Sequence, residues 1–275
     1  MMRALVVASL VAAFVATGTS LQAQGAPPAG QGRGGGAPQG QGRAGGPPAT
    51  PRANAPIDLT GYWVAIISED WRWRMVTPAK GDYASIPLSQ AGKDAADQWD
   101  PARDAAAGEP CKSYGAPGLM RAPTRLNISW QGDQTLKVDA DYGQQTRLLQ
   151  FASSGSPTEP AARPAGGVPS LQGDSVAAWE AAGGRGGAPR TGNLRVVTTN
   201  LRPGYLRKNG VPYGGNATYT EYWDLFAGRN NEQWLVVTSI VRDPQNLQRE
   251  WITSLNFKKE ANGAKWDPTP CSTTW

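Results

Sequence analysis

Residues 124–151, TRLNISWQGDQTLKVDADYGQQTRLLQF, contain three strand patterns separated by two short turns. In the first pattern Leu126, Ile128 and Trp130 alternate with polar residues, so one face of a strand would be apolar. Glycine and polar residues between the patterns are typical of tight turns. We therefore predict a meander with strands at 124–130, 135–139 and 145–151 and turns at Gln131-Gly132-Asp133 and Tyr142-Gly143.

Strand patterns continue on both sides of the meander. Segments rich in β-branched and aromatic residues occur at 61–68, 194–199, 217–226, 233–241 and 250–257, with a hairpin turn at Arg229-Asn230-Asn231. Helices are predicted only at 89–99, with Ser89 as its cap, and at 175–182 (SVAAWEAA). We predict a mainly β fold with one or two short helices, in which an antiparallel meander closes into a barrel. Closure removes exposed strand edges, and a β-sandwich is the alternative.

The N-terminal part of the chain has the composition of an exported protein. Residues 1–23 combine Arg3, an apolar run and a small residue at Ala23, which is the pattern of a cleaved secretory signal. Residues 24–56 are rich in Gly, Pro and Gln, and we predict a disordered tether. Residues 57–275 are predicted to form one barrel-like domain, with Gly- and Pro-rich insertions near 152–173 and 183–192. We expect a periplasmic or extracellular protein without a membrane span.

The complete absence of histidine narrows the range of possible functions. Among its 275 residues the chain has no histidine, so the commonest general base and the commonest metal ligand are both missing. We expect no metal, no cofactor and no nucleic-acid partner. A net charge of +5 is moderate and indicates either weak attraction to anionic envelope polymers or a solvated basic surface.

Cys111 and Cys271 are the only two cysteines of the chain. In an oxidising compartment two cysteines most simply form one disulfide. Such a bond would hold the C-terminal tail against the segment that precedes the meander. A reactive thiol at Cys111 is the alternative, but the chain has no histidine to activate it.

Two resemblances to known proteins support the predicted fold. Gly61-Tyr62-Trp63 matches the Gly-x-Trp that opens the first strand of lipocalin-like barrels. An ordered set of motifs resembles a widespread group of uncharacterised, secreted, β-rich bacterial proteins. These motifs are Ile86-Pro87-Leu88-Ser89-x-x-Gly92, Trp99-Asp100-Pro101, Cys111 with Gly115-x-Pro117-x-x-Met120, 172–180 (QGDSVAAWE), Leu194-x-Val196-x-Thr198-Thr199, Gly210-x-Pro212, Thr220-Glu221-Tyr222 and Val241-x-Asp243-Pro244 before Trp251. Members of the group commonly carry histidine at the position of Asp174. The resemblance implies a fold and a compartment, and no chemistry.

Trp71-Arg72-Trp73-Arg74 is the most suggestive cluster for binding. In a strand the two indoles would share one side and the two guanidiniums the other. Indoles stack on sugars or conjugated ligands, and arginine binds carboxylate or phosphate. The alternative is that both tryptophans belong to the core and both arginines face solvent. An eight-stranded barrel has room for either arrangement.

A basic, aromatic loop at 202–213 supplies further candidate ligand contacts. It contains Tyr205, Arg207 and Tyr213 and joins two predicted strands. Loops at a barrel mouth are common places for binding, although a surface loop without a ligand is the alternative.

Carboxylates are the remaining route to catalysis. Glu69, Asp70, Asp82, Glu221 and Asp224 lie in or beside aromatic segments, and Glu221 is also assigned to the predicted ligand site. Two carboxylates at a suitable separation are sufficient for glycoside hydrolysis.

These observations lead to three hypotheses of function. The first is a secreted, non-enzymatic barrel that binds a small amphipathic or carbohydrate-like ligand. The second is a carboxylate-dependent hydrolase. The third is an envelope interaction or structural protein whose barrel is filled. The volume inside the barrel separates the first hypothesis from the third.

Overall fold

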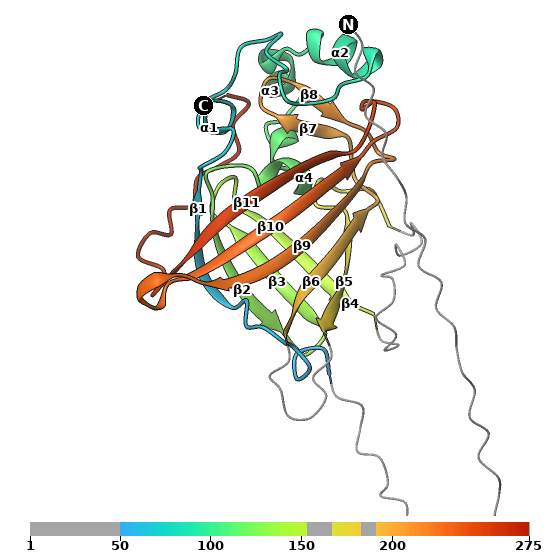
Figure 1. Cartoon of the computed structure of the whole chain (residues 1–275). Coiled ribbons are helices and arrows are strands. Elements are labelled where there is room, and N and C mark those ends of the chain that lie inside the picture. Colours follow the sequence, from blue (N-terminus) through green and yellow to red (C-terminus); the bar gives the residue numbers. More distant parts are fainter. Residues whose placement is uncertain (1–49, 153–166, 183–190, 275) are drawn as a thin grey trace, which may run out of the picture. The chain divides into compact units, whose positions relative to one another are not determined.

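The computed structural model describes residues 50–152, 167–182 and 191–274, and in these residues nine strands close into a barrel (Figure 1). The strands follow one another around the barrel in the order β1, β11, β10, β9, β6, β5, β4, β3 and β2. Their bounds are β1 Gly61–Ile66, β2 Arg125–Gln131, β3 Thr135–Ala140, β4 Gln145–Phe151, β5 Asp174–Ala182, β6 Thr191–Thr199, β9 Thr218–Ala227, β10 Gln233–Arg242 and β11 Trp251–Glu260. The predicted mainly β fold and its closure into a barrel are confirmed.

Several predictions concern residues outside the described part of the chain. The predicted signal at 1–23 lies there, as do residues 24–49 of the predicted tether and 153–166 and 183–190 of the two insertions. The last residues of the tether segment are described, and they contact the barrel. Trp179 donates its indole N–H to the carbonyl of Pro51, with a distance of 2.8 Å.

The predicted meander corresponds to β2, β3 and β4. Ile128 lies opposite Val138 in the β2–β3 register, and both side chains are buried, so the apolar alternation faces inward. Both turns contain a glycine with positive φ, Gly132 at 68° and Gly143 at 76°. Glycine adopts this conformation without the steric cost that a Cβ atom brings.

Residues 175–182 belong to strand β5, so the helix predicted there is wrong. β5 pairs along its length with β6, and its residues 175–177 pair in parallel with residues 149–151 of β4. Ala177 and Trp179 both pack against the core, as the two-residue period of a strand requires. Pairing on both edges overrides the helix propensity of alanine. The parallel β4–β5 contact is the departure from the predicted antiparallel order.

Large side chains fill the interior of the barrel. Trp63 and Trp223 are fully buried, and Trp63 donates its indole N–H to the carbonyl of Leu59 at 2.9 Å. The surrounding core consists mainly of aliphatic and aromatic residues, which include Leu126, Ile128, Leu136, Val138, Leu149, Leu194, Val196, Leu235, Val237, Leu255 and Phe257. The interior is therefore a packed core, and a ligand of the kind in the first hypothesis would have to bind elsewhere.

Short helices and a small hairpin cover one end of the barrel, and we call this set the cap (Figure 1). Its elements are α1 Trp71–Arg74, α2 Gln90–Asp97, α3 Pro101–Ala106, η1 Lys112–Tyr114, α4 Ala116–Leu119, β7 Gly204–Arg207 and β8 Val211–Tyr213. A further 3-10 turn, η2 Arg229–Asn231, forms the predicted hairpin turn between β9 and β10. Ser89 accepts a hydrogen bond from the Gly92 N–H at 3.0 Å and caps α2, as predicted. The described residues thus contain more short helices than the one or two expected.

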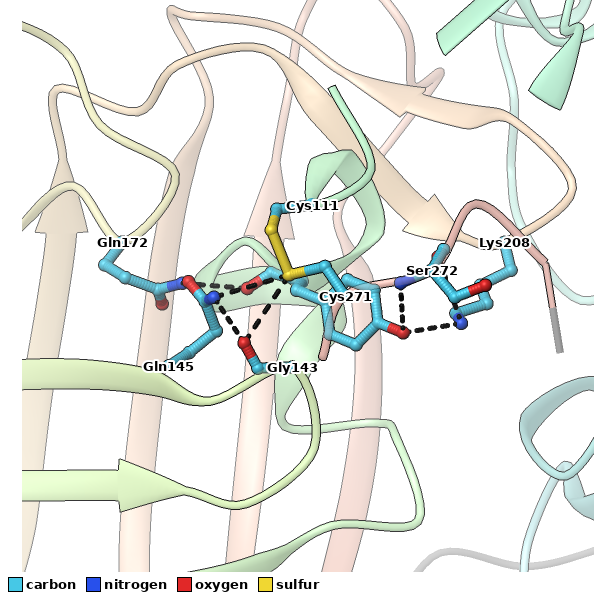
Figure 2. Close-up of a disulfide and its surroundings, with 8 residues drawn as sticks. Cys111, Gly143, Gln145, Gln172, Lys208, Cys271 and Ser272 are labelled. Carbon is cyan, nitrogen blue, oxygen red and sulfur yellow. Dashed lines mark hydrogen bonds between the residues drawn. A yellow bond between two sulfur atoms is a disulfide. The ribbon is translucent and has the colours of Figure 1, made fainter. Parts of the chain in front are cut away.

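The disulfide between Cys111 and Cys271 is confirmed, with the two Cα atoms 5.1 Å apart. Figure 2 shows Cys271 beside Gly143 and Gln145 on one side, and Ser272 beside Lys208 on the other. Gln145 donates to the Gly143 carbonyl at 2.7 Å. The bond joins the C-terminal residues to Cys111, directly before η1 of the cap, and Cys271 Sγ also contacts the Gly143 carbonyl in the turn between β3 and β4 at 3.5 Å.

Candidate functional site

Trp71-Arg72-Trp73-Arg74 forms the single helical turn α1, so the strand predicted for this segment is wrong. Asp70 has a left-handed φ of 53°, which turns the chain after β1, and Trp73 N–H donates to the Asp70 carbonyl at 2.9 Å. A helical turn sends successive side chains in different directions, so the two indoles do not share a face. Trp71 is 65% exposed, whereas Arg74 is buried.

Two guanidinium groups lie over the ring of Trp73. The Arg72 and Arg207 guanidinium carbons lie 4.5 and 4.8 Å from the centroid of its ring. The indole N–H donates to Asp82 at 3.0 Å, and Asp82 also accepts a hydrogen bond from Arg72 at 2.6 Å. The hydrogen bond from Arg72 is the main reason that the pKa of Asp82 is lowered. Trp73 is therefore fixed in place, with cations over its ring.

Three arginines from different parts of the cap are buried together behind Trp73. Arg74, Arg121 and Arg207 are only 3%, 4% and 4% exposed. Arg74 pairs with Glu69 and donates to the carbonyl of Arg121 at 2.7 Å. Arg121 contacts Asp70 at 2.8 Å.

Arg207 differs from the other two arginines in its partners. It donates to Ser85 Oγ at 2.9 Å and to the main-chain carbonyl of Asp82 at 3.5 Å. Among the described residues no carboxylate lies within ion-pair distance of its guanidinium.

The three arginines line a small pocket, which we call the arginine pocket. It has a volume of about 20 Å³ and is partly open to solvent. Trp73, Arg74, Gly118, Arg121, Arg207 and Lys208 contribute to its walls. A Cβ at Gly118 would lie 2.6 Å from the carbonyl oxygen of Tyr205, so a larger residue would push this wall out of place.

Each of the three arginines retains one buried N–H group without a hydrogen-bond partner in the described part of the chain. These groups are Nη2 of Arg74, Nη1 of Arg121 and Nε of Arg207. Buried polar groups are normally hydrogen-bonded, and an unpaired donor costs free energy. All three donors belong to residues that line the arginine pocket, which makes this pocket a candidate site for a hydrogen-bond acceptor.

Charge crowding in the pocket points in the same direction. Burial, and then the nearby charge of Arg121, lower the pKa of both Arg74 and Arg207 to about 10. The Coulomb interaction with Arg121 is repulsive because both groups are positively charged. An anion between these groups would offset this repulsion and accept their unpaired N–H groups.

Lys208 adds an amine to the wall of the pocket. It is 4% exposed, and burial lowers its pKa from 10.5 to about 7. Its Nζ donates to Tyr114 Oη at 2.9 Å and lies 4.6 and 5.3 Å from the ring centroids of Tyr114 and Tyr142. The side chain is also 3.4 Å from the Ser272 carbonyl, close to the disulfide (Figure 2).

The remaining predicted ligand residues are not brought together with the arginine pocket. Residues 204–213 form the β7–β8 hairpin instead of an open loop. Tyr213 is buried in the core of the cap, and burial raises its pKa. Tyr205 donates its hydroxyl to Asp104 at 2.7 Å and does not line the pocket, although its carbonyl packs behind Gly118.

Glu221 lies in the barrel interior. It forms a fully buried ion pair with Arg147, whose Nη1 lies 3.0 Å from Glu221 Oε1. Arg147 also contacts Thr198 Oγ1 at 3.4 Å. Because the pair is enclosed by the core, Glu221 has no path to a ligand in this structure. The predicted carboxylate chemistry therefore finds no accessible site at Glu221.

Arg121 and Lys208 were missed as site residues by sequence reasoning. Lys208 lies in the basic loop that the sequence singles out, but its burial is a property of the tertiary structure. Arg121 stands alone before a strand, and no local pattern distinguishes it from a solvated arginine.

A wider, shallow hollow is a weaker candidate for a binding site than the arginine pocket, and the described carboxylates do not form a metal site. The hollow, of about 540 Å³, lies around Lys80 and Trp99 and is largely open to solvent. Its charged side chains, Lys80, Asp100 and Arg103, are exposed. In the described ranges no group of three His, Cys, Asp or Glu side chains could hold a metal ion. Within those ranges no helix is long and apolar enough to cross a membrane.

Comparison of the chain with protein-family models, with curated proteins and with solved structures finds no match. The resemblance to secreted, β-rich bacterial proteins therefore stays a prediction. The arginine pocket is the feature of the structure on which a proposal of function rests.

Proposed function

We propose that this protein is an exported, non-enzymatic barrel protein that binds a small molecule through its negatively charged group in the arginine pocket. The observation that carries the proposal is the set of three buried guanidinium N–H groups without partners around one cavity. Arginine binds carboxylates and phosphates through a planar fork of donors, and burial strengthens such hydrogen bonds.

The size of the cavity limits what enters it. About 20 Å³ holds roughly one water-sized group, so only one oxygen of the charged end of a ligand fits inside. The rest of the molecule would lie outside the pocket, near Trp73 and the surface of α1. The filled barrel serves as a rigid support for the cap instead of as the ligand cavity.

The other two predicted functions receive less support. A hydrolase needs accessible carboxylates, but Glu221 is buried against Arg147. Glu69, Asp70 and Asp82 are engaged by arginines around the pocket. A purely structural barrel would account for the packed interior, but it would give no function to a pocket lined by three buried arginines.

Calorimetric titration with simple anions tests the proposal. Acetate and sulfate, added separately in chloride-free buffer, should bind saturably and change the tryptophan fluorescence through Trp73. Arg207→Gln should weaken binding about tenfold or more, because a hydrogen bond to a charged group contributes about 1.5–3 kcal/mol. Arg207→Lys keeps the charge but removes the fork and should give an intermediate loss.

Arg242→Gln is the matched control, since Arg242 is exposed and pairs with Glu250 away from the pocket. It should leave anion binding unchanged. If a folded protein, judged by circular dichroism, binds neither anion saturably, the proposal is wrong and a structural role for the filled barrel is favoured.

Export is the second part of the proposal. The disulfide supports an oxidising compartment, where such bonds persist. Expression of the whole chain in bacteria, followed by fractionation and N-terminal sequencing, should recover protein that begins at Gln24 in the periplasm or medium. Uncleaved protein in the cytoplasm with two free thiols would contradict it.

A further inference from the structure

Three large apolar side chains are exposed on and directly after α1, next to the arginine pocket. Trp71, Met75 and Val76 are 65%, 49% and 55% exposed, and we call them the apolar shelf. Such side chains are costly to leave in water when they are grouped, and grouped exposed apolar residues commonly mark binding surfaces.

The apolar shelf and the pocket are built on the same few residues. Trp73 and Arg74 line the pocket, while Trp71 precedes them and Met75 follows them in the chain. Trp71 and Met75 are four residues apart along a helical turn, so their side chains lie on the same side. A charged group held by Arg74 would therefore bring whatever is attached to it close to the shelf.

We propose that the ligand of the arginine pocket is a single-chain amphiphile with a carboxylate head and an unbranched alkyl tail, whose tail lies on the apolar shelf. This inference rests on the proposed function. One oxygen of a carboxylate head fits a pocket that admits roughly one water-sized group, and three arginines at this pocket offer donors. The exposed apolar surface beside it suits an alkyl tail, whereas a strongly polar substituent would leave the shelf uncovered.

Charge complementarity favours a carboxylate over a neutral amphiphile. Arg72, Arg74 and Arg121 are each paired with a carboxylate, whereas the contacts of Arg207 are with uncharged oxygens. The pocket thus carries excess positive charge, which Lys208 increases when it is protonated. A fatty-acid head is negatively charged at neutral pH and would neutralise this excess.

The test compares straight-chain carboxylates of increasing length below the concentration at which they form micelles. Acetate, hexanoate and decanoate are titrated into the full chain. A tail that lies on an open surface buries about half of each methylene, which corresponds to about a twofold gain in affinity per carbon. Decanoate should therefore bind at least tenfold more tightly than hexanoate, and decanol should bind far more weakly than decanoate.

A variant of the apolar shelf separates the contribution of the tail to the affinity from that of the head. The triple substitution Trp71→Ser, Met75→Ser and Val76→Ser changes exposed side chains only and should preserve the fold. It should abolish the gain with chain length and leave acetate binding unchanged. Phe226→Ser, which alters an equally exposed apolar residue in β9, is the matched control and should retain the gain.

The possible failures are distinguishable. If acetate binds but decanoate binds no more tightly, the amphiphile proposal is wrong while the proposed anion site stands. If no carboxylate and no sulfate binds, the proposed function itself fails. If anionic phospholipid vesicles bind through the shelf but monomeric decanoate does not, the surface recognises a membrane and the single-chain proposal is overturned.

Discussion

At the scale of single residues, Lys208 is a buried amine whose surroundings lower its pKa to about 7. It is an amine enclosed by the rings of Tyr114 and Tyr142 and by the tail that follows Cys271. Burial raises the pKa of Tyr114 and of Tyr142, so both rings stay neutral when Lys208 titrates near pH 7. Arg74 and Arg207, with pKa values near 10, stay charged in the same range.

The depressed pKa of Lys208 predicts a specific pH dependence of stability. Between about pH 7 and 10.5 the folded state binds fewer protons at this amine than the unfolded state, so the free energy of unfolding rises with pH. We expect a rise of about 1 kcal/mol per pH unit between pH 7 and 9, measured by urea unfolding. Because the chain has no histidine, few other side chains change charge in this window.

Lys208→Met should flatten this dependence and raise the stability at pH 7, since methionine fills the site without a charge to bury. Lys265→Met, at an exposed position, should keep the slope of the natural chain. An unchanged slope in Lys208→Met would show that the amine is not the titrating group.

Local patterns identified only part of the candidate site. The unusual Trp-Arg repeat and the basic loop drew attention to Trp73, Arg74 and Arg207, which do line the pocket. The same reasoning selected Glu221 because an acidic residue among aromatic residues resembles a ligand contact. Its partner Arg147 lies 74 residues away in sequence, on β4, and only the closed barrel brings the two together.

At the scale of elements, the turns of the meander were predictable because their constraints are local. Gly132 and Gly143 both have positive φ, but their surroundings differ. A Cβ at Gly143 would lie 2.2 Å from the ring of Tyr114, whereas a Cβ at Gly132 would meet no atom within 4 Å. An added Cβ would therefore cause only backbone strain at Gly132, but both backbone strain and steric overlap at Gly143.

Gly132→Ala should destabilise the fold by about 1–2 kcal/mol, which is the cost of a left-handed conformation for a residue with a Cβ. Gly143→Ala should cost about 1–3 kcal/mol more, because the ring of Tyr114 has to move. Equilibrium unfolding of both variants measures the difference. Equal losses would show that the ring is free to adjust.

Helix and strand assignments failed where the deciding interactions are distant. The alanine-rich β5 has helical propensity, but its strand form is imposed by β6 on one edge and by β4 on the other. The alternation of Trp and Arg at 71–74 has the period of a strand, but the left-handed Asp70 turns the chain into α1. In both segments tertiary structure outweighs the local pattern.

At the scale of the whole molecule, the number of strand patterns predicted a barrel or a sandwich, and the cost of exposed strand edges favoured the barrel. The content of the barrel was not predictable. Whether the inward side chains fill the interior depends on their combined volume across nine strands. Trp63 and Trp223, on strands far apart in sequence, occupy this space together. Because the interior is packed, the proposed anion site lies in the cap.

The disulfide connects the C-terminal residues covalently to the cap. Its removal tests how much this connection contributes to the free energy of unfolding. It joins residues that are 160 positions apart, so on the chain-entropy model it restricts the unfolded chain by about 5 kcal/mol, which is an upper figure. Replacing both Cys111 and Cys271 by Ser should lower the free energy of unfolding by about 2–5 kcal/mol, measured in urea at constant pH. Reduced natural protein should lose a similar amount of stability.

The tail near Ser272 should also loosen in both proteins, which would admit water to Lys208 and weaken the pH dependence described above. Unchanged stability in both the double variant and the reduced protein would mean that contacts such as the Ser272 N–H to the Tyr114 hydroxyl, at 3.1 Å, hold the tail without the covalent bond.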